Sequence, residues 1–302
     1  MNSIKEFLKN IPYVGSEIKF IKKTHISFLG KEKYIKKKWL REFGYPLNIK
    51  NPITFNEKIQ WEKIYSNNEL AKRCVDKIEV HNYVKELIGE KYLNKIIGVY
   101  SNIRDIRFEN LPEKFVIKAS HDSGSVLVVD NKSNINQQKL RLINKNLKLN
   151  YGKVSKEWVY DDIKPRILVE NFLESGDEKS LKDYKIFCFE GKPKLIQVDF
   201  DRFEEHTRNF YDMDWNRLDF EILYKNADYD VEKPELLNEM IKLSSILAKP
   251  FNHVRVDWYI SQNKLIFGEM TFFPESGFGS FSSKEWENKL GSYFNISKDL
   301  SY

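Results

Sequence analysis

The stretch RVDWYISQNKLIFGEMTFFPESGFG, residues 255–279, is the most informative part of the chain. From residue 254 to residue 260, apolar and polar side chains alternate, which is the period of a β-strand. Residues 262–264 form the expected turn, since asparagine tolerates the left-handed backbone conformation. Residues 265–273 then return as a second strand. The stretch therefore predicts a β-hairpin.

The hairpin would place two acidic side chains together. With a three-residue turn, Asp257 faces Glu269 and Arg255 faces Thr271, with Cβ atoms about 4.5–5.5 Å apart. Two carboxylates at that distance repel, so we expect a divalent cation; Mg²⁺ suits one or two carboxylates plus phosphate oxygens. A two-residue turn would shift the register and spoil the pairing. The alternative is that both acids are ordinary polar-face residues, paired with Arg255 and a lysine.

Composition predicts a globular protein with one large domain or two modest ones. The chain has 302 residues, of which 41% are hydrophobic and 14% are aromatic. It has no apolar run near the roughly 18 residues that a transmembrane helix needs, so we expect no transmembrane helix, and the composition of residues 1–15 leads us to expect no secretory signal. Cys74 and Cys188 lie among apolar neighbours, which indicates buried free thiols and a reducing compartment. We therefore expect a cytoplasmic protein.

The net charge of +6 is concentrated at the N-terminus. Residues 1–42 contain 11 Lys/Arg and 4 Asp/Glu, so the remaining chain is about neutral. This distribution argues against a nucleic-acid-binding body and for one basic arm. Within the arm, an apolar helical face is expected at Ile4, Phe7, Leu8 and Ile11. Two interpretations stay open: residues 1–42 lie on an anionic membrane surface, or the helix docks on the body with its lysines solvated.

Two helices are expected before the first sheet. Thr54 caps a helix, and Glu57 completes a capping box. A second helix is expected over residues 68–87, ending at Gly89.

Strands then flank a turn of small residues. Residues 115–118 and 126–129 are expected strands, and residues 121–125 form the turn between them. Backbone N–H groups in such a turn can bind an anion, and Lys118 would add a point charge. It is not a Walker loop, and an ordinary hairpin with a surface lysine is the alternative.

The middle of the chain adds a helix, a buried strand and a second hairpin. Residues 134–151 are expected to be a polar helix, and residues 165–173 a buried strand. Residues 183–189 pair with residues 195–200. Lys185 lies in mid-strand, where a lysine needs a partner or a ligand.

Taken in order, these features resemble the ATP-grasp superfamily, and most closely its TupA-like branch, which is associated with teichuronopeptide and other cell-surface polysaccharide assembly. The shared pattern is PITFNEK at 52–58, IGEKYL at 88–93, FVIK at 115–118, DYK at 183–185, and RVD followed by FGEMTF over 255–272. The last block is the most specific. The resemblance covers roughly residues 45–295.

The resemblance implies an α+β fold in which two lobes with antiparallel sheets grip ATP, preceded by a helical basic segment. The implied segments are a basic amphipathic stretch at 1–50, a helical region at 51–110, a lobe with a phosphate lid at 111–175, and a C-terminal lobe with a metal site at 176–302. Cofactor-binding roles fall on Lys118, Ser123, Gly124, Ser125, Glu170, Asn171, Phe172, Leu173 and Lys185. Metal ligation falls on Asp257, Glu269 and Thr271, and catalysis on Arg255 and Lys185. Thr271 departs from the family pattern, in which asparagine is common.

The implied activity is an ATP- and Mg²⁺-dependent carboxylate–amine ligase that works through an acyl phosphate, with a small-molecule or glycan carboxylate and an amine acceptor as substrates. Such a reaction needs charge neutralisation and positioning rather than a protein nucleophile. One alternative is a glycosyltransferase that uses the Asp199-Phe200-Asp201 triplet to hold a nucleotide-sugar through a metal. In that triplet, an ion pair with Arg202 or Lys194 is the simpler interpretation. Another alternative is a nucleotide-binding protein without turnover.

Overall fold

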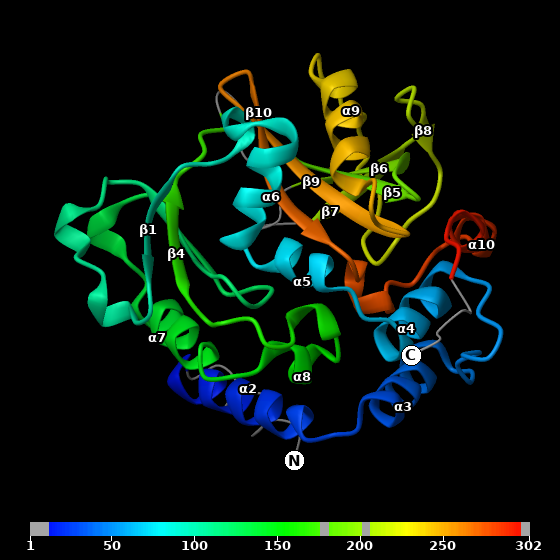
Figure 1. Cartoon of the computed structure of the whole chain (residues 1–302), viewed down its shortest axis with the longest axis horizontal. Coiled ribbons are helices and arrows are strands. Elements are labelled where there is room, and N and C mark those ends of the chain that lie inside the picture. Colours follow the sequence, from blue (N-terminus) through cyan, green and yellow to red (C-terminus); the bar gives the residue numbers. More distant parts are fainter. Residues whose placement is uncertain (1–11, 176–180, 201–205, 297–302) are drawn as a thin grey trace. The chain divides into compact units, whose positions relative to one another are not determined.

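The computed structural model describes residues 12–175, 181–200 and 206–296 (Figure 1). The chain divides into two compact units. Unit 1 takes the described parts of Met1–Lys33, Asp76–Ile78 and Asn94–Phe172; unit 2 takes those of Tyr34–Val75, Glu79–Leu93 and Leu173–Tyr302. The segment expected at 51–110 contributes to both units. The apolar face expected at residues 4–11 lies outside the described residues, as do Asp201 and Arg202.

Unit 1 is built on a four-stranded antiparallel sheet with the order β1-β4-β2-β3. Its strands are β1 (Ile96–Tyr100), β2 (Phe115–Ala119), β3 (Val126–Val129) and β4 (Ile167–Asn171). Its helices are α2 (Pro12–Ser27), α7 (Gln137–Asn146) and α8 (Tyr151–Ser155), with short 3-10 turns at η2 (Ile103–Asp105), η3 (Phe108–Asn110), η4 (Lys132–Asn134) and η5 (Trp158–Tyr160).

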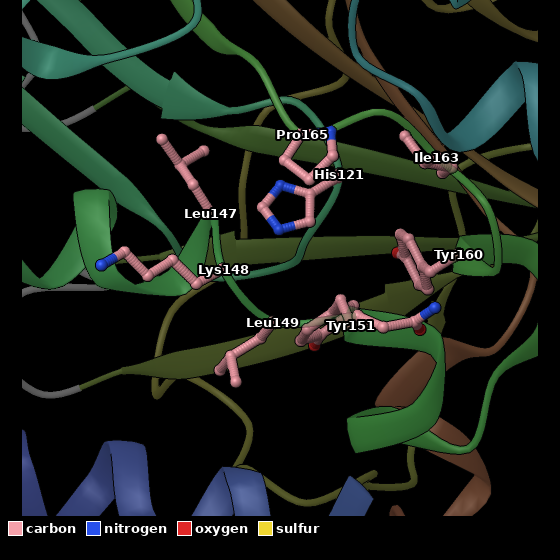
Figure 2. Close-up of a pocket in the computed structure, with 9 residues that line it drawn as sticks. His121, Leu147, Lys148, Leu149, Tyr151, Tyr160, Ile163 and Pro165 are labelled. Atoms are coloured by element: carbon pink, nitrogen blue, oxygen red, sulfur yellow. The ribbon is translucent and has the colours of Figure 1, made fainter.

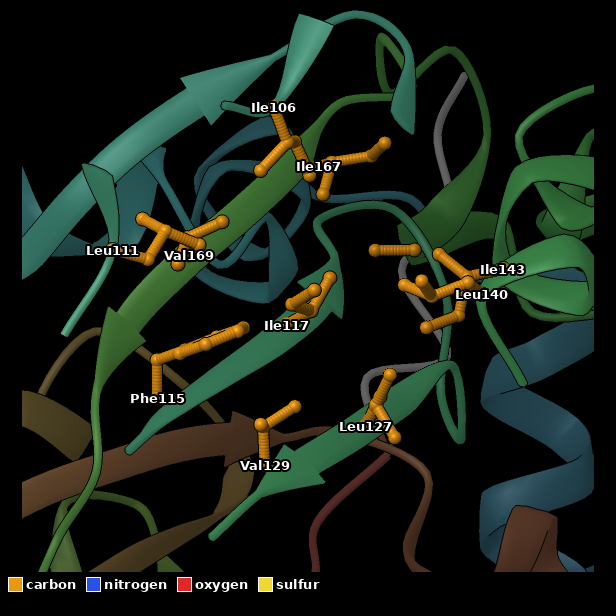
Figure 3. Close-up of a cluster of buried hydrophobic side chains, with 11 residues drawn as sticks. Ile106, Leu111, Phe115, Ile117, Leu127, Val129, Leu140, Ile143, Ile167 and Val169 are labelled. Carbon is orange, nitrogen blue, oxygen red and sulfur yellow. The ribbon is translucent and has the colours of Figure 1, made fainter. Parts of the chain in front are cut away.

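One face of the unit 1 sheet is the hydrophobic core. Phe115 and Ile117 of β2 and Val169 of β4 pack with Leu140 and Ile143 of α7, and all are buried (Figure 3). Strand residues alternate between faces, so residues 116 and 118 of β2 point away from this core. The sheet therefore has a covered face and a second face that is available for function.

The polar helix expected over residues 134–151 is two helices. Asn136 caps α7 and Asn150 caps α8, because each side chain accepts a hydrogen bond from the backbone N–H three residues on. The expectation of one helix was wrong because asparagine competes for backbone donors and starts a new helix at residue 150.

Unit 2 is built on a six-stranded antiparallel sheet with the order β10-β9-β5-β6-β7-β8. Its strands are β5 (Asp183–Phe189), β6 (Lys192–Phe200), β7 (Thr207–Tyr211), β8 (Arg217–Leu218), β9 (His253–Ser261) and β10 (Lys264–Thr271). Its helices are α3 (Lys31–Phe43, which begins in unit 1), α4 (Phe55–Tyr65), α5 (Glu69–Val75), α6 (Glu79–Ile88), α9 (Leu237–Ala248) and α10 (Lys284–Tyr293), with η1 (Glu90–Tyr92) and η6 (Pro274–Gly277). The expected α+β class with two antiparallel sheets is confirmed.

Helix α9 covers the apolar face of this sheet, against β5, β6 and β9 (Figure 1). Leu243, Leu247 and Trp258 are buried there, and the Trp258 indole N–H donates to the Ser244 hydroxyl over 2.8 Å. Because α9 takes one face, the polar residues that alternate with Trp258 belong to the other.

Helix α4 begins at the expected residue, whereas the single helix expected after it is two helices, α5 and α6. Thr54 and Glu57 form both hydrogen bonds of a capping box. The helix expected over 68–87 is interrupted between α5 and α6, where Asp76 accepts hydrogen bonds from the Ile78 N–H over 2.8 Å and from Arg166 over 2.9 Å. An aspartate that satisfies backbone and arginine donors ends the helix, so the single-helix expectation was wrong.

Candidate active site

The β9–β10 hairpin brings the two acids opposite each other. Asp257 pairs with Glu269, and Arg255 pairs with Thr271. The turn has two residues, Gln262 and Asn263, both with positive φ (50° and 57°). A bulge between residues 267 and 269 then shifts the register by one. The expected pairing is confirmed, but the expected three-residue turn was wrong: a tight turn and a bulge together give the same register.

Asp257 is buried among cations. Arg255 donates from Nε and Nη2 to the two carboxylate oxygens of Asp257, each over 2.7 Å. The Lys185 ammonium donates to Asp257 Oδ2 over 3.0 Å. Burial disfavours the charged form of Arg255, but the charge and hydrogen bonds of Asp257, together with the charges of Glu269 and Glu275, outweigh it, so the pKa of Arg255 is raised. Within the described residues, Arg255 and a lysine provide the neutralisation that the opposed acids require.

Six charged side chains form what we call the charged belt. It crosses one face of the unit 2 sheet from β9 to β7, because the pairing sets Asp257 beside Lys185, Asp183 beside Asp199, and Asp199 beside Arg208. All are at most 7% exposed. The members are Asp183, Lys185, Asp199, Arg208, Arg255 and Asp257. The belt therefore combines three acids with three bases in a setting where a lone charge would be costly.

Lys185 connects the two ends of the belt. Its Nζ contacts Asp183, and lies 3.0 Å from Asp257 and 3.8 Å from Asp199. The sequence argument that a mid-strand lysine needs a partner is confirmed by these contacts.

Asp199 is paired with a partner that the sequence did not identify. Arg208 donates from Nε to Asp199 Oδ1 over 2.6 Å, and Gln197 donates to the same oxygen over 2.9 Å. Burial alone would raise the pKa of Asp199, but the nearby His206 ring, whose Nε2 lies 3.5 Å from Oδ1, and the charges of Arg208 and Lys185 lower it well below its usual range. Asp199 is thus an ionised member of the belt.

Glu269 and Thr271 lie at the open end of the belt. The Glu269 side chain is 51% exposed, and Arg255 Nη2 lies 3.9 Å from its Oε1. The Thr271 hydroxyl donates to Glu269 over 3.5 Å. The donors of this corner are therefore two carboxylates and a hydroxyl on neighbouring strands.

Oxygen donors of this kind fit Mg²⁺. A carboxylate offers about four lone-pair sites, and Asp257 uses three for Arg255 and Lys185. No group of three or more His, Cys, Asp and Glu side chains suitable for a metal ion occurs in the described part of the chain. Mg²⁺ commonly takes only one or two protein carboxylates, with waters and phosphate oxygens completing its shell, so Asp257 and Glu269 suffice in number.

A strained turn supplies one further acid at the belt. Glu275, Ser276 and Gly277 all have positive φ, at 49°, 56° and 66°. Lys63 and Gln60 of α4 donate to the Ser276 carbonyl over 3.1 Å and 3.0 Å and hold this backbone in place. Two non-glycine residues in the left-handed region are costly, which favours a functional reason for the turn.

The turn directs the Glu275 carboxylate to Arg208 over 2.9 Å. Sequence reasoning gave Glu275 no role and did not pair it with Arg208, because the sequence PESG indicates little beyond a turn with proline and glycine.

In unit 1, Lys118 and Glu170 form an ion pair on the sheet face away from the core. Their charged atoms lie 2.5 Å apart. Val126 and Val128 of the neighbouring edge strand are on this face and are 37% and 42% exposed. The two exposed valines therefore form a small apolar surface next to the positive charge of Lys118. Such a surface suits a ligand in which a planar base is linked to phosphate.

The turn after β2 is anchored at its base and open at its tip. Ser123 and Gly124 are exposed, and Gly124 has a φ of 92°. Ser125 is buried: its hydroxyl donates to the Asp122 carboxylate and accepts from Asn146 over 2.9 Å. A phosphate contact assigned to this turn would therefore come from Ser123 and Gly124 rather than from the Ser125 side chain.

The strand β4 leads from Glu170 to the point where the two units divide. Asn171 is tied down by its backbone, since its N–H donates to Lys95 and its carbonyl accepts from Asn94. The division falls between Phe172 and Leu173. The four residues assigned to nucleotide contacts from 170 to 173 thus include the unit boundary.

A cavity of about 190 Å³ lies beside the turn. Its lining includes His121, Leu149, Tyr151 and Tyr160, and Figure 2 shows the His121 ring among these side chains. The His121 imidazole contacts the Asn146 carbonyl over 3.1 Å, and burial lowers the pKa of His121. A histidine held neutral here supports the turn by hydrogen bonding.

Comparison with solved structures gives only low similarity. D-alanine–D-alanine ligase from Bacillus anthracis in complex with ATP aligns with 16% identity and a TM-score of 0.38, over 66% of this chain and 53% of that one. D-alanine–D-alanine ligase from Helicobacter pylori aligns with 15% identity and a TM-score of 0.37, over 74% of this chain and 61% of that one. D-alanyl-alanine synthetase A from Vibrio cholerae aligns with 10% identity and a TM-score of 0.37, over 67% of this chain and 56% of that one. The chain thus spans less than two thirds of the length of each of these proteins.

A search of curated proteins gives no significant match. The family model described as TupA-like ATPgrasp, in contrast, matches residues 57–295. This match covers most of the 302 residues, including both sheets and the whole charged belt. The chain therefore belongs to the TupA-like ATP-grasp family.

Proposed function

We propose that this protein is an ATP- and Mg²⁺-dependent ligase that joins a carboxylate to an amine. The observation that carries the proposal is the charged belt with Asp257 opposite Glu269, in a chain of the TupA-like ATP-grasp family. Phosphoryl transfer demands fixed cations and positioned acids more than covalent chemistry by the protein. The belt supplies both on one sheet.

In the proposed reaction, a carboxylate oxygen of the substrate attacks the γ-phosphorus of ATP, ADP leaves, and an acyl phosphate forms. The amine then attacks the acyl carbon, phosphate leaves with the electron pair of the bond between the acyl carbon and the phosphate oxygen, and the amine proton is released. Arg255 and Lys185 are assigned to the transferring phosphoryl group, and Lys118 to the phosphates of ATP. Ser123, Gly124 and Ser125 are assigned to the lid, and residues 170–173 to the adenine.

Asp257 and Glu269 would hold the Mg²⁺, with Thr271 beside them. The ion would neutralise the phosphate charge that develops during transfer. Arg255 keeps its guanidinium on Asp257 and faces Glu269, so it is already oriented toward the same corner. Such pre-orientation costs no rearrangement at the moment of reaction.

For the substrate, we propose an amino acid or peptide unit that is attached to a cell-surface polysaccharide or its precursor in the cytoplasm. The association of the TupA-like branch with such polymers supports this choice. The glycosyltransferase alternative receives no support from Asp199, whose carboxylate is buried against Arg208 and Gln197 rather than open to a nucleotide-sugar.

Thermal unfolding with ATP, with and without Mg²⁺, tests the proposal. A ligand at about 100 times its dissociation constant adds about 2.7 kcal/mol of stability. We expect a Mg²⁺-dependent rise in Tm that Glu269→Gln weakens and that Glu232→Gln, the same change at an exposed site, leaves intact. A rise with a UDP-sugar and none with ATP would replace the ligase by the transferase.

A further inference from the structure

The end of helix α2 and the residues directly after it present exposed apolar and basic side chains. Ile21, Lys22 and His25 are exposed on the helix, and Phe28 and Leu29 are exposed directly after its last residue, Ser27. We call these five residues the exposed face of α2. Phe28 is 83% exposed, Ile21 64% and Leu29 40%. Large apolar side chains grouped on one surface mark a site of interaction.

The opposite face of α2 is docked on unit 1, against α7 and α8 (Figure 1). Lys23 donates to Asn146 over 3.5 Å. The buried Lys156 donates to the Ile26 and Leu29 carbonyls, each over 2.7 Å, and so satisfies the C-terminal end of the helix. These contacts hold α2 and the backbone of Leu29 on unit 1, whereas the helix expected at residues 4–11 lies outside the described residues.

The charge of the chain segment that contains this face decides what covers it. Residues 1–33, the first segment of unit 1, carry 7 lysines against 3 glutamates. Two copies of so basic a segment would repel each other, whereas an anionic surface would attract it. In the described residues, no helix is long and apolar enough to cross a membrane.

We propose that the exposed face of α2 binds the surface of an anionic lipid membrane. Phe28 and Ile21 enter the interfacial region, and Lys22 meets the lipid phosphates, as in helices that lie in the plane of a bilayer. The docked face stays on unit 1, so the whole of that unit is held at the surface. This surface belongs to a segment that is separate from the residues assigned to the ligase reaction, and its test is independent of them.

Vesicle co-sedimentation of the full chain tests the proposal. The probes are vesicles of phosphatidylcholine with phosphatidylglycerol and vesicles of phosphatidylcholine alone. We expect binding to the anionic vesicles that weakens with added salt. Phe28→Ser should lower the affinity about tenfold, from the lost burial of an aromatic ring. Lys22→Gln should lower it about fivefold.

Matched controls separate this surface from general stickiness and basicity. Ile53→Ser removes an apolar side chain that is 62% exposed elsewhere, and Lys233→Gln removes an exposed lysine of unit 2. Both should bind like the wild type. Equal binding by Phe28→Ser and the wild type would overturn the proposal, and so would equal binding to neutral vesicles. A lower molar mass of Phe28→Ser in light scattering would assign the face to a second copy instead.

Discussion

Replacing Asp199 by asparagine tests whether the charged belt is held by paired charges. Asp199 receives hydrogen bonds from Arg208 over 2.6 Å and 3.3 Å, and Lys185 lies 3.8 Å away. The substitution leaves three cations facing two belt acids in a buried setting. Removing one partner of a buried ion pair costs about 3–5 kcal/mol. Glu275 remains on Arg208, so we expect about 3 kcal/mol.

The measurement is the midpoint of thermal unfolding near neutral pH. One kcal/mol shifts Tm by about 2–4 °C for 150–250 residues, so Asp199→Asn should lower Tm by about 6–12 °C. Asp219→Asn makes the same chemical change at an exposed position and should change stability by less than about 0.5 kcal/mol. Asp199 has no assigned role in the ligase reaction, so we expect Asp199→Asn to have little effect on activity that is measured well below the lowered Tm.

The pH dependence has a defined sign. The folded protein holds the pKa of Asp199 well below its usual range, so its ionised form stabilises the fold. That contribution is complete above the unfolded value of about 3.9 and declines as pH falls toward the folded pKa. Between about pH 5 and pH 3, the difference between wild type and Asp199→Asn should shrink by about 1 kcal/mol. An unchanged Tm near neutral pH, or a difference that grows in acid, would refute the reasoning.

Three further predictions concern other parts of the structure. Gly277→Ala should lower the free energy of unfolding by about 2–4 kcal/mol, since φ is +66° and the added Cβ would lie 2.6 Å from side-chain atoms of Ile59 and Gln60 in α4. Gly124→Ala, at φ +92° but in open space, should cost less, and equal losses in Tm for the two variants would contradict this prediction. Lys156→Met should speed amide hydrogen exchange in α2, because the Ile26 and Leu29 carbonyls lose a buried hydrogen-bond donor worth about 1–3 kcal/mol. The same change at the exposed Lys153 should leave the exchange rate unchanged. Burial raises the pKa of Cys74 to about 12, so iodoacetamide near pH 8 should modify it no faster than the protein unfolds; rapid labelling of the native protein would disprove the burial.

Much of the hairpin could be predicted from alternation alone. The pairing of Asp257 with Glu269 was correct even though the turn was not, because the bulge beside Gly268 compensates for the shorter turn. A bulge of this kind leaves no mark in the polar–apolar pattern except the glycine itself. The alternation of polar and apolar residues predicts the two strands, whereas the exact register depends on the bulge between residues 267 and 269.

The belt's far end could not be predicted for a different reason. Asp199 meets Arg208 across β6 and β7, and Glu275 reaches Arg208 from a turn that is much later in the chain. Sequence spacing suggests neighbours within one helix or one hairpin. It does not suggest a side chain that arrives from a strained turn held by a helix near residue 60. The nearer charges, Arg202 and Lys194, were therefore considered for Asp199 instead.

The two interpretations of Asp257, ion pairing and metal ligation, do not exclude each other. Buried ion pairs contribute little net stability, since apolar side chains of similar volume often stabilise a protein more. A belt of six buried charges is therefore poorly explained by stability. It is better explained by chemistry, because cations that are already desolvated and fixed by acids stabilise transferred charge without reorganising. Arg255 and Lys185 neutralise Asp257 in the structure, and the same two groups are those assigned to phosphate. In the proposed reaction, their pairing with Asp257 would hold them in position for that role.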